Sequence, residues 1–196
     1  MSRIRLAGLA TLLVIAAPAA AAHADATLVP GLTFTARSGA AGTSTTDIGA
    51  TSDSDALSML SAGEAWDVPC ELRTIKSDIN GAGTSITDDF DRCTTTSPNK
   101  TVGWLNNEGI HVYGIQVCTH SANDRLKGIK LIGGEVQSDG TFDRAGHSKS
   151  FERTNCNTWG TTVFCPVGQV ATKVRVHHTG DTINGLSLGC RVVAPL

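Results

Sequence analysis

This 196-residue chain has few charged or aromatic residues, and what it lacks narrows its function. Charged residues make up 17% of the sequence and aromatic residues 5%. No stripe of lysine and arginine is present, which argues against nucleic acid or an anionic membrane surface as a partner. No apolar run is long enough for a membrane-spanning helix, so no membrane insertion is expected.

Long amphipathic helical periods are also missing from the sequence. Glycine is abundant, with 21 residues, and serine, threonine, asparagine and aspartate are plentiful as well. This composition is typical of short strands joined by many turns. The sequence therefore predicts an all-β fold.

The first residues have the three parts of a secretory signal. Arg3 and Arg5 form a basic start, residues 9–17 are apolar, and a small alanine-rich stretch follows. Cleavage after Ala24 or after Ala26 fits the pattern. Loss of the two arginines would take the formal charge from −2 to −4. A secreted protein, extracellular or periplasmic, is expected.

Three parts of the chain differ in character. Residues 1–24 are predicted to be the signal peptide, and residues 66–196 a compact β-prism-like domain. The segment 25–65 between them is expected to be partly loop or disordered. It offers one alternating stretch at 32–37, and residues 38–55 are small and polar.

The clearest local signal is a β-hairpin near the C-terminus. Residues 174–176 and 183–190 alternate apolar and polar side chains, and a polar turn separates them. A similar unit runs from 115–117 to 126–131, with a glycine at the same place. Two such copies suggest a repeated sheet module, and a third would lie between about 66 and 93.

The order of these elements resembles a known family. Trp159-Gly160, the step from Phe164 to Gly168 and the stretch from Gly180 to Cys190 together look like the closing repeat of vitelline membrane outer layer protein I. The resemblance implies three β-sheets packed as a prism, as in jacalin-like lectins. It also implies association with an extracellular layer, sugar binding and a lysozyme-like glycosyl-transfer activity.

The six cysteines are expected to form three disulfides, since an exported protein meets an oxidising compartment. Cys165 and Cys190 flank the C-terminal hairpin, so they are expected to pair. Nearest-neighbour reasoning then pairs the other four as Cys70 with Cys93 and Cys118 with Cys156.

Polar turn residues and one aromatic are the candidate carbohydrate site. Carboxylates and amides satisfy sugar hydroxyls, and an aromatic ring covers the apolar face of a sugar. The predicted binding residues are Asn123, Asp124, Trp159, Gly180 and Asp181. Trp104 and Tyr113 are further stacking candidates. The alternative is that Trp104 and Trp159 are aromatic residues of the core or of a sheet edge.

Motifs for catalysis or metal binding are weak. Gly185 to Gly189 matches a G-x-S-x-G pattern, but no acid or histidine follows it as a nucleophile elbow requires. His177 and His178 are neighbours on a strand and point to opposite faces, which opposes chelation. No catalytic residue, metal or cofactor is assigned.

Three functions remain after this reading. The leading one is non-catalytic binding of a carbohydrate or glycoconjugate through loops at one end of the sheets. The second is a structural or interaction protein of an extracellular layer. The third is an enzyme that cleaves or transglycosylates cell-wall or chitin-like glycans. The sequence gives no oligomeric state.

Overall fold

The computed structural model describes residues 25–49, 52–81, 83–95, 99–105 and 108–196. The expected signal peptide, residues 1–24, lies outside the described residues. Within the described ranges the chain forms strands and turns but no α-helix, and so no helix there is long and apolar enough to cross a membrane. The all-β expectation is confirmed.

The described strands form three antiparallel sheets. The first has the order β1 (Ala26–Leu28), β15 (Thr182–Pro195), β14 (Gln169–Thr179) and β4 (Ser44–Ile48), and β2 (Thr33–Phe34) and β3 (Ser38–Gly39) also pair with β15. The second has the order β11 (Phe142–Glu152), β10 (Leu126–Val136), β9 (Ile110–Thr119) and β12 (Thr158–Trp159), and β13 (Val163–Phe164) also pairs with β9. The third has the order β7 (Thr84–Asp91), β6 (Val68–Asp78), β5 (Asp55–Ala65) and β8 (Lys100–Gly103).

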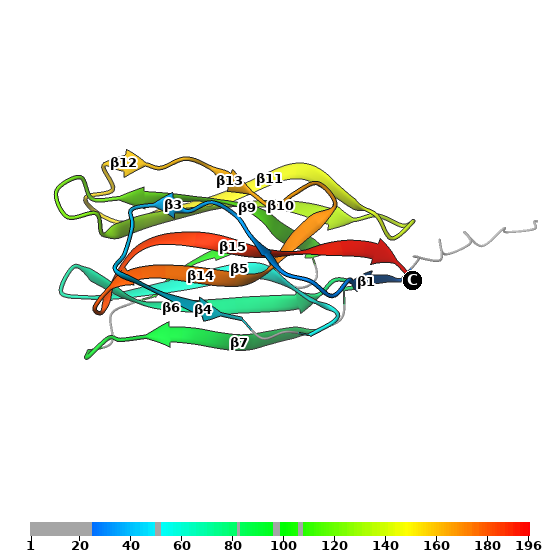
Figure 1. The fold of residues 1–196 in the computed structure, drawn as a ribbon, viewed down its shortest axis with the longest axis horizontal. Coiled ribbons are helices and arrows are strands. Elements are labelled where there is room, and N and C mark those ends of the chain that lie inside the picture. The colour runs from blue at the N-terminus through cyan, green and yellow to red at the C-terminus, as the bar shows by residue number, and fades with distance from the viewer. Residues whose placement is uncertain (1–24, 50–51, 82, 96–98, 106–107) are drawn as a thin grey trace, which may run out of the picture.

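The three sheets enclose one apolar core (Figure 1). Its fully buried side chains include Leu60 from the third sheet, Ile115 from the second and Leu186 from the first. A smaller cluster around Leu28 and Val193 lies where β1 pairs with the end of β15. Each sheet has one apolar face, and it buries that face against the apolar faces of the other two sheets.

Each sheet is built on a central hairpin, and the three hairpins carry irregularities at matching positions. One residue in the second strand of each hairpin, and one in the first strand, has no partner in the register. Such bulges bend a strand and increase its twist. The unpaired second-strand residues are Cys70, Lys127 and Asn184, and the first-strand ones are Ser58, Tyr113 and Thr172.

The third repeat is the β5–β6 hairpin, which differs from the unit expected between 66 and 93. The expected strand 70–75 lies in β6 and the weaker stretch 86–90 lies in β7. The first strand of the repeat comes earlier, as β5, and its turn is Trp66-Asp67. Tryptophan is not a usual turn residue and no glycine follows it, which is why the sequence did not reveal this hairpin.

The expected division at residue 65 therefore falls at the end of β5, inside a hairpin. Residues 25–65 contribute strands to the first and third sheets: β1 pairs with β15, β4 with β14 and β5 with β6. The bulge at Ser58 breaks the alternation of β5, and β4 is polar and lies at a sheet edge.

The repeated glycine marks a close backbone approach in the first sheet. A Cβ on Gly185 would lie 2.6 Å from the carbonyl oxygen of Ala40 and 2.7 Å from that of Ser38. In the second sheet, a Cβ on Gly128 would lie 2.9 Å from the carbonyl oxygen of Phe151. Glycine at these places lets the neighbouring strand, β3 or β11, approach the hairpin closely.

Three disulfides link the described strands. Cys165 pairs with Cys190, Cys70 with Cys93 and Cys118 with Cys156, and no cysteine is left free. These are the pairs given by the nearest-neighbour argument. The Cys70–Cys93 bond ties the segment after β7 to the second strand of the third sheet.

Candidate functional site

The three hairpin turns meet at one end of the molecule. Figure 1 shows the β5–β6, β9–β10 and β14–β15 turns at the left, opposite β1 and the C-terminus. We call this the tip end. Two clefts lie between these turns, and each contains residues from more than one sheet. The fold thus brings distant polar turns together on a rigid frame, which is where binding sites usually occur.

The first of these, here named the amide cleft, has a volume of about 310 Å³. It lies between the β9–β10 loop, the β14–β15 turn and the loop before β4. Its lining is almost entirely polar, which suits a ligand with many hydroxyl groups. The lining residues are Ala41, Asn123, Asp124, Arg125, Thr179, Thr182 and Asn184.

Asn184 is the best-placed recognition group in the amide cleft. It is the unpaired residue of the β15 bulge and is only 5% exposed. Its Nδ2 donates to the main-chain carbonyl of Asp124 at 3.2 Å, which ties two of the turns together. Its buried Oδ1 accepts no hydrogen bond from any residue that the structure describes. A buried amide oxygen without a donor is uncommon, and it points to a missing partner.

The walls of the amide cleft are held by local hydrogen bonds. Asn123 Oδ1 accepts from the main-chain N–H of Arg125 at 3.3 Å, and Asp124 adopts a positive φ of 55°. On the other wall, the ring Nδ1 of His178 lies 2.8 Å from the carbonyl oxygen of Gly180. Both turns are therefore shaped before any ligand arrives.

A second cleft, here named the tryptophan cleft, has a volume of about 190 Å³. It lies between the β5–β6 turn, the β14–β15 turn and the segment after β7. Its lining combines mainly apolar residues with Thr94, Arg92 and Asp181. The lining residues are Ala65, Trp66, Val68, Cys70, Arg92, Thr94 and Asp181.

Trp66 is the most exposed large apolar side chain of the described residues, at 86%. It and Asp67 form a two-residue turn in which both φ angles are positive, 49° and 66°. Such turns normally use asparagine and glycine, and a bulky residue in this conformation is strained. Strain of this kind is retained where the surrounding structure imposes it, often at functional sites.

The structure places four of the five predicted site residues at the tip end. Asn123 and Asp124 line the amide cleft, and Asp181 lines the tryptophan cleft. Gly180 lies in the turn between the two clefts. Trp159 is on β12, paired with Cys118 and beside Gly128, and it lines neither cleft.

Burial excludes the two other stacking candidates. Trp104 is 2% exposed and Tyr113 is 6% exposed, so both rings belong to the core.

Sequence reasoning missed Trp66 and Asn184. The signal for Trp66 was an aromatic directly before an aspartate, between two strands. For Asn184 the signal was its place directly before the repeated glycine Gly185. The equivalent residue before Gly128, in the β9–β10 hairpin, is Lys127.

The neighbouring histidines have structural partners. His177 Nε2 lies 2.9 Å from Ser187 Oγ, while His178 Nε2 lies 3.1 Å from Thr46 Oγ1. His178 also packs against the ring of Phe90 with centroids 4.8 Å apart. The two rings face opposite sides of β14, and so they do not form a chelating pair.

One group of potential metal ligands lies near the third sheet, formed by Glu71, Asp91 and Cys93. Cys93 is bonded to Cys70, so its sulfur is not a thiolate. Glu71 Oε1 lies 2.6 Å from Nε of Arg73, an ion pair that already neutralises this carboxylate. The group is best explained as a structural ion pair beside a disulfide.

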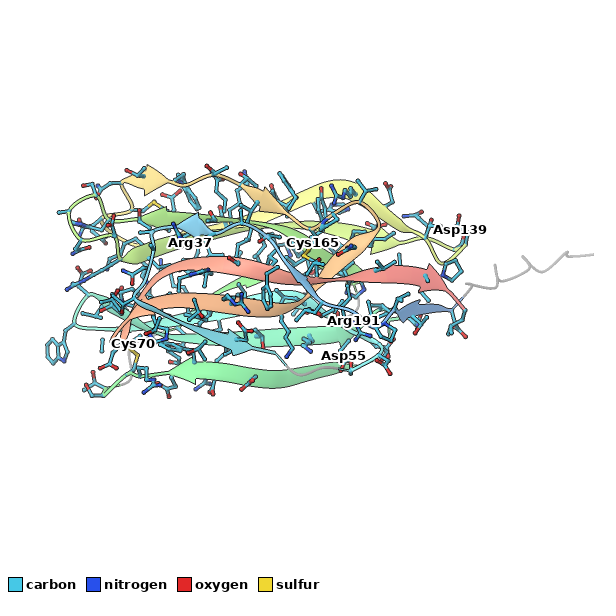
Figure 2. All side chains as sticks on the ribbon, viewed as in Figure 1. Arg37, Asp55, Cys70, Asp139, Cys165 and Arg191 are labelled. Carbon is cyan, nitrogen blue, oxygen red and sulfur yellow. A yellow bond between two sulfur atoms is a disulfide. The ribbon has the colours of Figure 1, made fainter. Side chains whose placement is uncertain are left out.

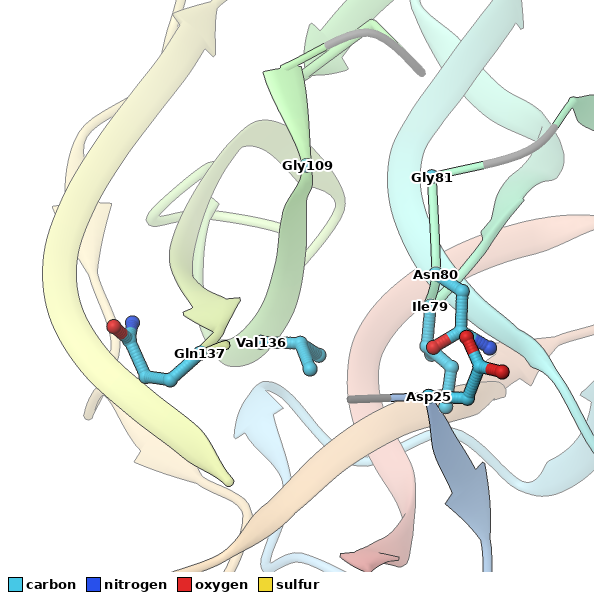
Figure 3. Close-up of a pocket in the computed structure, with 7 residues that line it drawn as sticks. All are labelled: Asp25, Ile79, Asn80, Gly81, Gly109, Val136 and Gln137. Atoms are coloured by element: carbon cyan, nitrogen blue, oxygen red, sulfur yellow. The ribbon is translucent and has the colours of Figure 1, made fainter. Parts of the chain in front are cut away.

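A third cleft lies at the far end, and Figure 3 shows its lining. It has a volume of about 200 Å³ and includes Asp25, Asn80 and Gln137. The Asn80 side chain binds both the N–H and the carbonyl of Ala26, at 2.8 and 3.0 Å. This amide therefore fixes the first strand of the first sheet.

Comparison with solved structures identifies proteins that share this fold. The chain is similar to the Malaysian banana lectin, with 9% identity, 85% of this chain and 100% of that one covered, and a TM-score of 0.51. It is also similar to a mannose-binding lectin from Champedak, with 10% identity, 83% and 99% covered, and a TM-score of 0.54. The chain has the jacalin-like β-prism fold.

A prostate-specific WGA16 glycoprotein lectin extends this set, with 13% identity, 86% and 99% covered, and a TM-score of 0.50. No family model and no curated protein matches the sequence. At these identities the likeness shows the β-prism fold alone. The narrower resemblance to vitelline membrane outer layer protein I is not confirmed by these comparisons.

Proposed function

We propose that this chain is a secreted, non-catalytic protein that binds a carbohydrate or glycoconjugate at its tip end. The observation that carries the proposal is the amide cleft, in which turns from two sheets surround Asn184 and its unpartnered amide oxygen. Amides, hydroxyls, a carboxylate and a guanidinium together match the alternating donors and acceptors of a sugar.

The fold supports this proposal by analogy. The β-prism neighbours named above carry the word lectin in their descriptions, and one is described as mannose-binding. Three disulfides fit an oxidising compartment outside the cytosol. Membership of the vitelline membrane outer layer protein I family is the finer proposal within this fold.

Glycan-array screening of the mature protein tests the function. We expect binding to at least one glycan, and weaker binding after Asn184→Ala or Asp124→Ala. Asp139→Ala serves as the matched control, since Asp139 is an acidic turn residue at the opposite end (Figure 2). Failure of the wild-type protein to bind any glycan contradicts the proposal. So does equal binding by all variants.

A further inference from the structure

The tryptophan cleft has no role in the proposed function so far. It shares a wall with the amide cleft, because Thr179 and Thr182 line one and Asp181 lines the other. These residues belong to a single turn, with Gly180 at its tip. A chain of sugar units is the kind of ligand that reaches both sides of such a wall.

The turn that carries Trp66 is held by hydrogen bonds from Lys127 to the next residue, Asp67. Lys127 is fully buried, and its Nζ donates to the main-chain carbonyl of Asp67 at 2.8 Å and to Asp67 Oδ1 at 2.5 Å. The same Nζ donates to Glu64 Oε2 at 3.2 Å. A buried cation of the second sheet therefore holds the strained turn of the third, and the exposed indole stands on a rigid base.

The opposite side of the cleft is fixed as well. The main-chain N–H of Arg92 donates to the carbonyl of Cys70 at 2.9 Å, and the Cys70–Cys93 disulfide follows directly. Arg92 and Asp181 both line this cleft, and one side chain can donate and the other accept, while the Arg92 guanidinium lies 5.7 Å from the centre of the Phe90 ring. An exposed ring beside such a pair suits a neutral hexopyranose, whose ring has an apolar face and hydroxyl edges.

We propose that Trp66, Arg92 and Asp181 form a second subsite, so that the tip end binds a neutral oligosaccharide across both clefts. This inference rests on the proposed function. Each cleft is at or below the lower end of the roughly 300–1,000 Å³ of typical ligand pockets, so each holds about one sugar unit. The second subsite then makes affinity grow with chain length.

Trp66→Asn is the decisive variant. Asparagine suits a positive φ, so this change keeps or strengthens the turn while it removes the ring. Trp66→Phe is the matched control that keeps an aromatic surface. The probes are mannotriose, chitotriose and maltotriose, each with its parent monosaccharide, titrated calorimetrically against the wild-type protein and both variants.

We expect a trisaccharide to bind the wild-type protein more tightly than its monosaccharide does. Trp66→Asn should weaken trisaccharide binding about tenfold and leave monosaccharide binding within about twofold. Trp66→Phe should retain most of the gain. The emission of the exposed indole should also shift when a trisaccharide binds, but not in Trp66→Asn.

The outcomes separate the two proposals. Saccharide binding that is unchanged by Trp66→Asn, or that does not increase from one unit to three, overturns the second subsite and leaves the proposed function intact. Absence of binding of all six probes also overturns the subsite. Absence of binding on the whole glycan array overturns the proposed function itself.

Discussion

Lys127 of the second sheet donates two hydrogen bonds to Asp67, the second residue of a strained turn in the third sheet. The Lys127 side chain is fully buried, whereas that of Asp67 is half exposed. This hydrogen bonding to Lys127 lowers the pKa of the Asp67 carboxyl. The contact links two repeats of the fold directly beside Trp66, which lines the tryptophan cleft.

Replacement of this lysine should destabilise the protein. Lys127→Met removes the hydrogen bonds from this cation to Glu64 and Asp67. We expect a loss of about 1.5–3 kcal/mol, typical of a hydrogen bond to a charged group, because Asp67 is half exposed and Glu64 keeps its contact with Arg153 at 3.1 Å. Urea unfolding measures the change. Lys130→Met, on the same strand but with a partly exposed side chain, is the control. Equal effects of the two would contradict the role of the contact.

Trp159 remains a predicted stacking residue, and its variant separates two roles. In the structure its ring lies beside Gly128, and its strand pairs with β9. Trp159→Ala should weaken glycan binding if the ring contacts the sugar. If the ring only covers the strand, the variant should lower the melting temperature and leave affinity unchanged. Calorimetric titration and thermal unfolding of the same sample decide between them.

The Cys165–Cys190 bond should contribute strongly to stability. It closes a loop between positions 25 residues apart, which corresponds to roughly 3–4 kcal/mol in the loop-entropy model. The double variant Cys165→Ala/Cys190→Ala should unfold at a correspondingly lower urea concentration and still bind glycan when folded. A loss below about 1 kcal/mol would show that the bond adds little to the β14–β15 hairpin.

Buried His111 should make stability depend on pH. Burial lowers its pKa from 6.5 to about 4, against a smaller opposing effect of Asp78. Between these values the unfolded chain binds a proton that the folded chain does not, so stability falls as pH drops from about 6.5 to about 4. The contribution is on the order of 3 kcal/mol. In His111→Gln this part of the pH dependence should be absent. Identical profiles in urea titrations would contradict the buried, neutral state.

The sequence predicted the hairpins in which the alternation of side chains and the turn residues agree with the tertiary structure. The β9–β10 and β14–β15 hairpins alternate clearly, and their glycines lie where a neighbouring strand approaches closely. The β5–β6 hairpin was missed because its turn is Trp66-Asp67, where a tryptophan takes the first position and no glycine follows it. Here the tertiary contact with Lys127, and not local propensity, holds the conformation.

The candidate site was predicted only in part, for a related reason. Turn residues such as Asn123 and Asp181 are visible as turns in the sequence, but their neighbours come from distant repeats. Asn184 stands within a strand pattern, and only the bulge in β15 directs it to the cleft. No spacing along the chain encodes that arrangement.

Chemical-shift mapping by nuclear magnetic resonance tests the central claim most directly. Isotope-labelled protein comprising residues 25–196 is titrated with a glycan that binds on the array, and the amide signals are followed. The account predicts shifts at residues 123–125, at 180–182 and at Asn184, with little change at the far end. Shifts concentrated around Asp25, Asn80 and Gln137, the cleft of Figure 3, would contradict it.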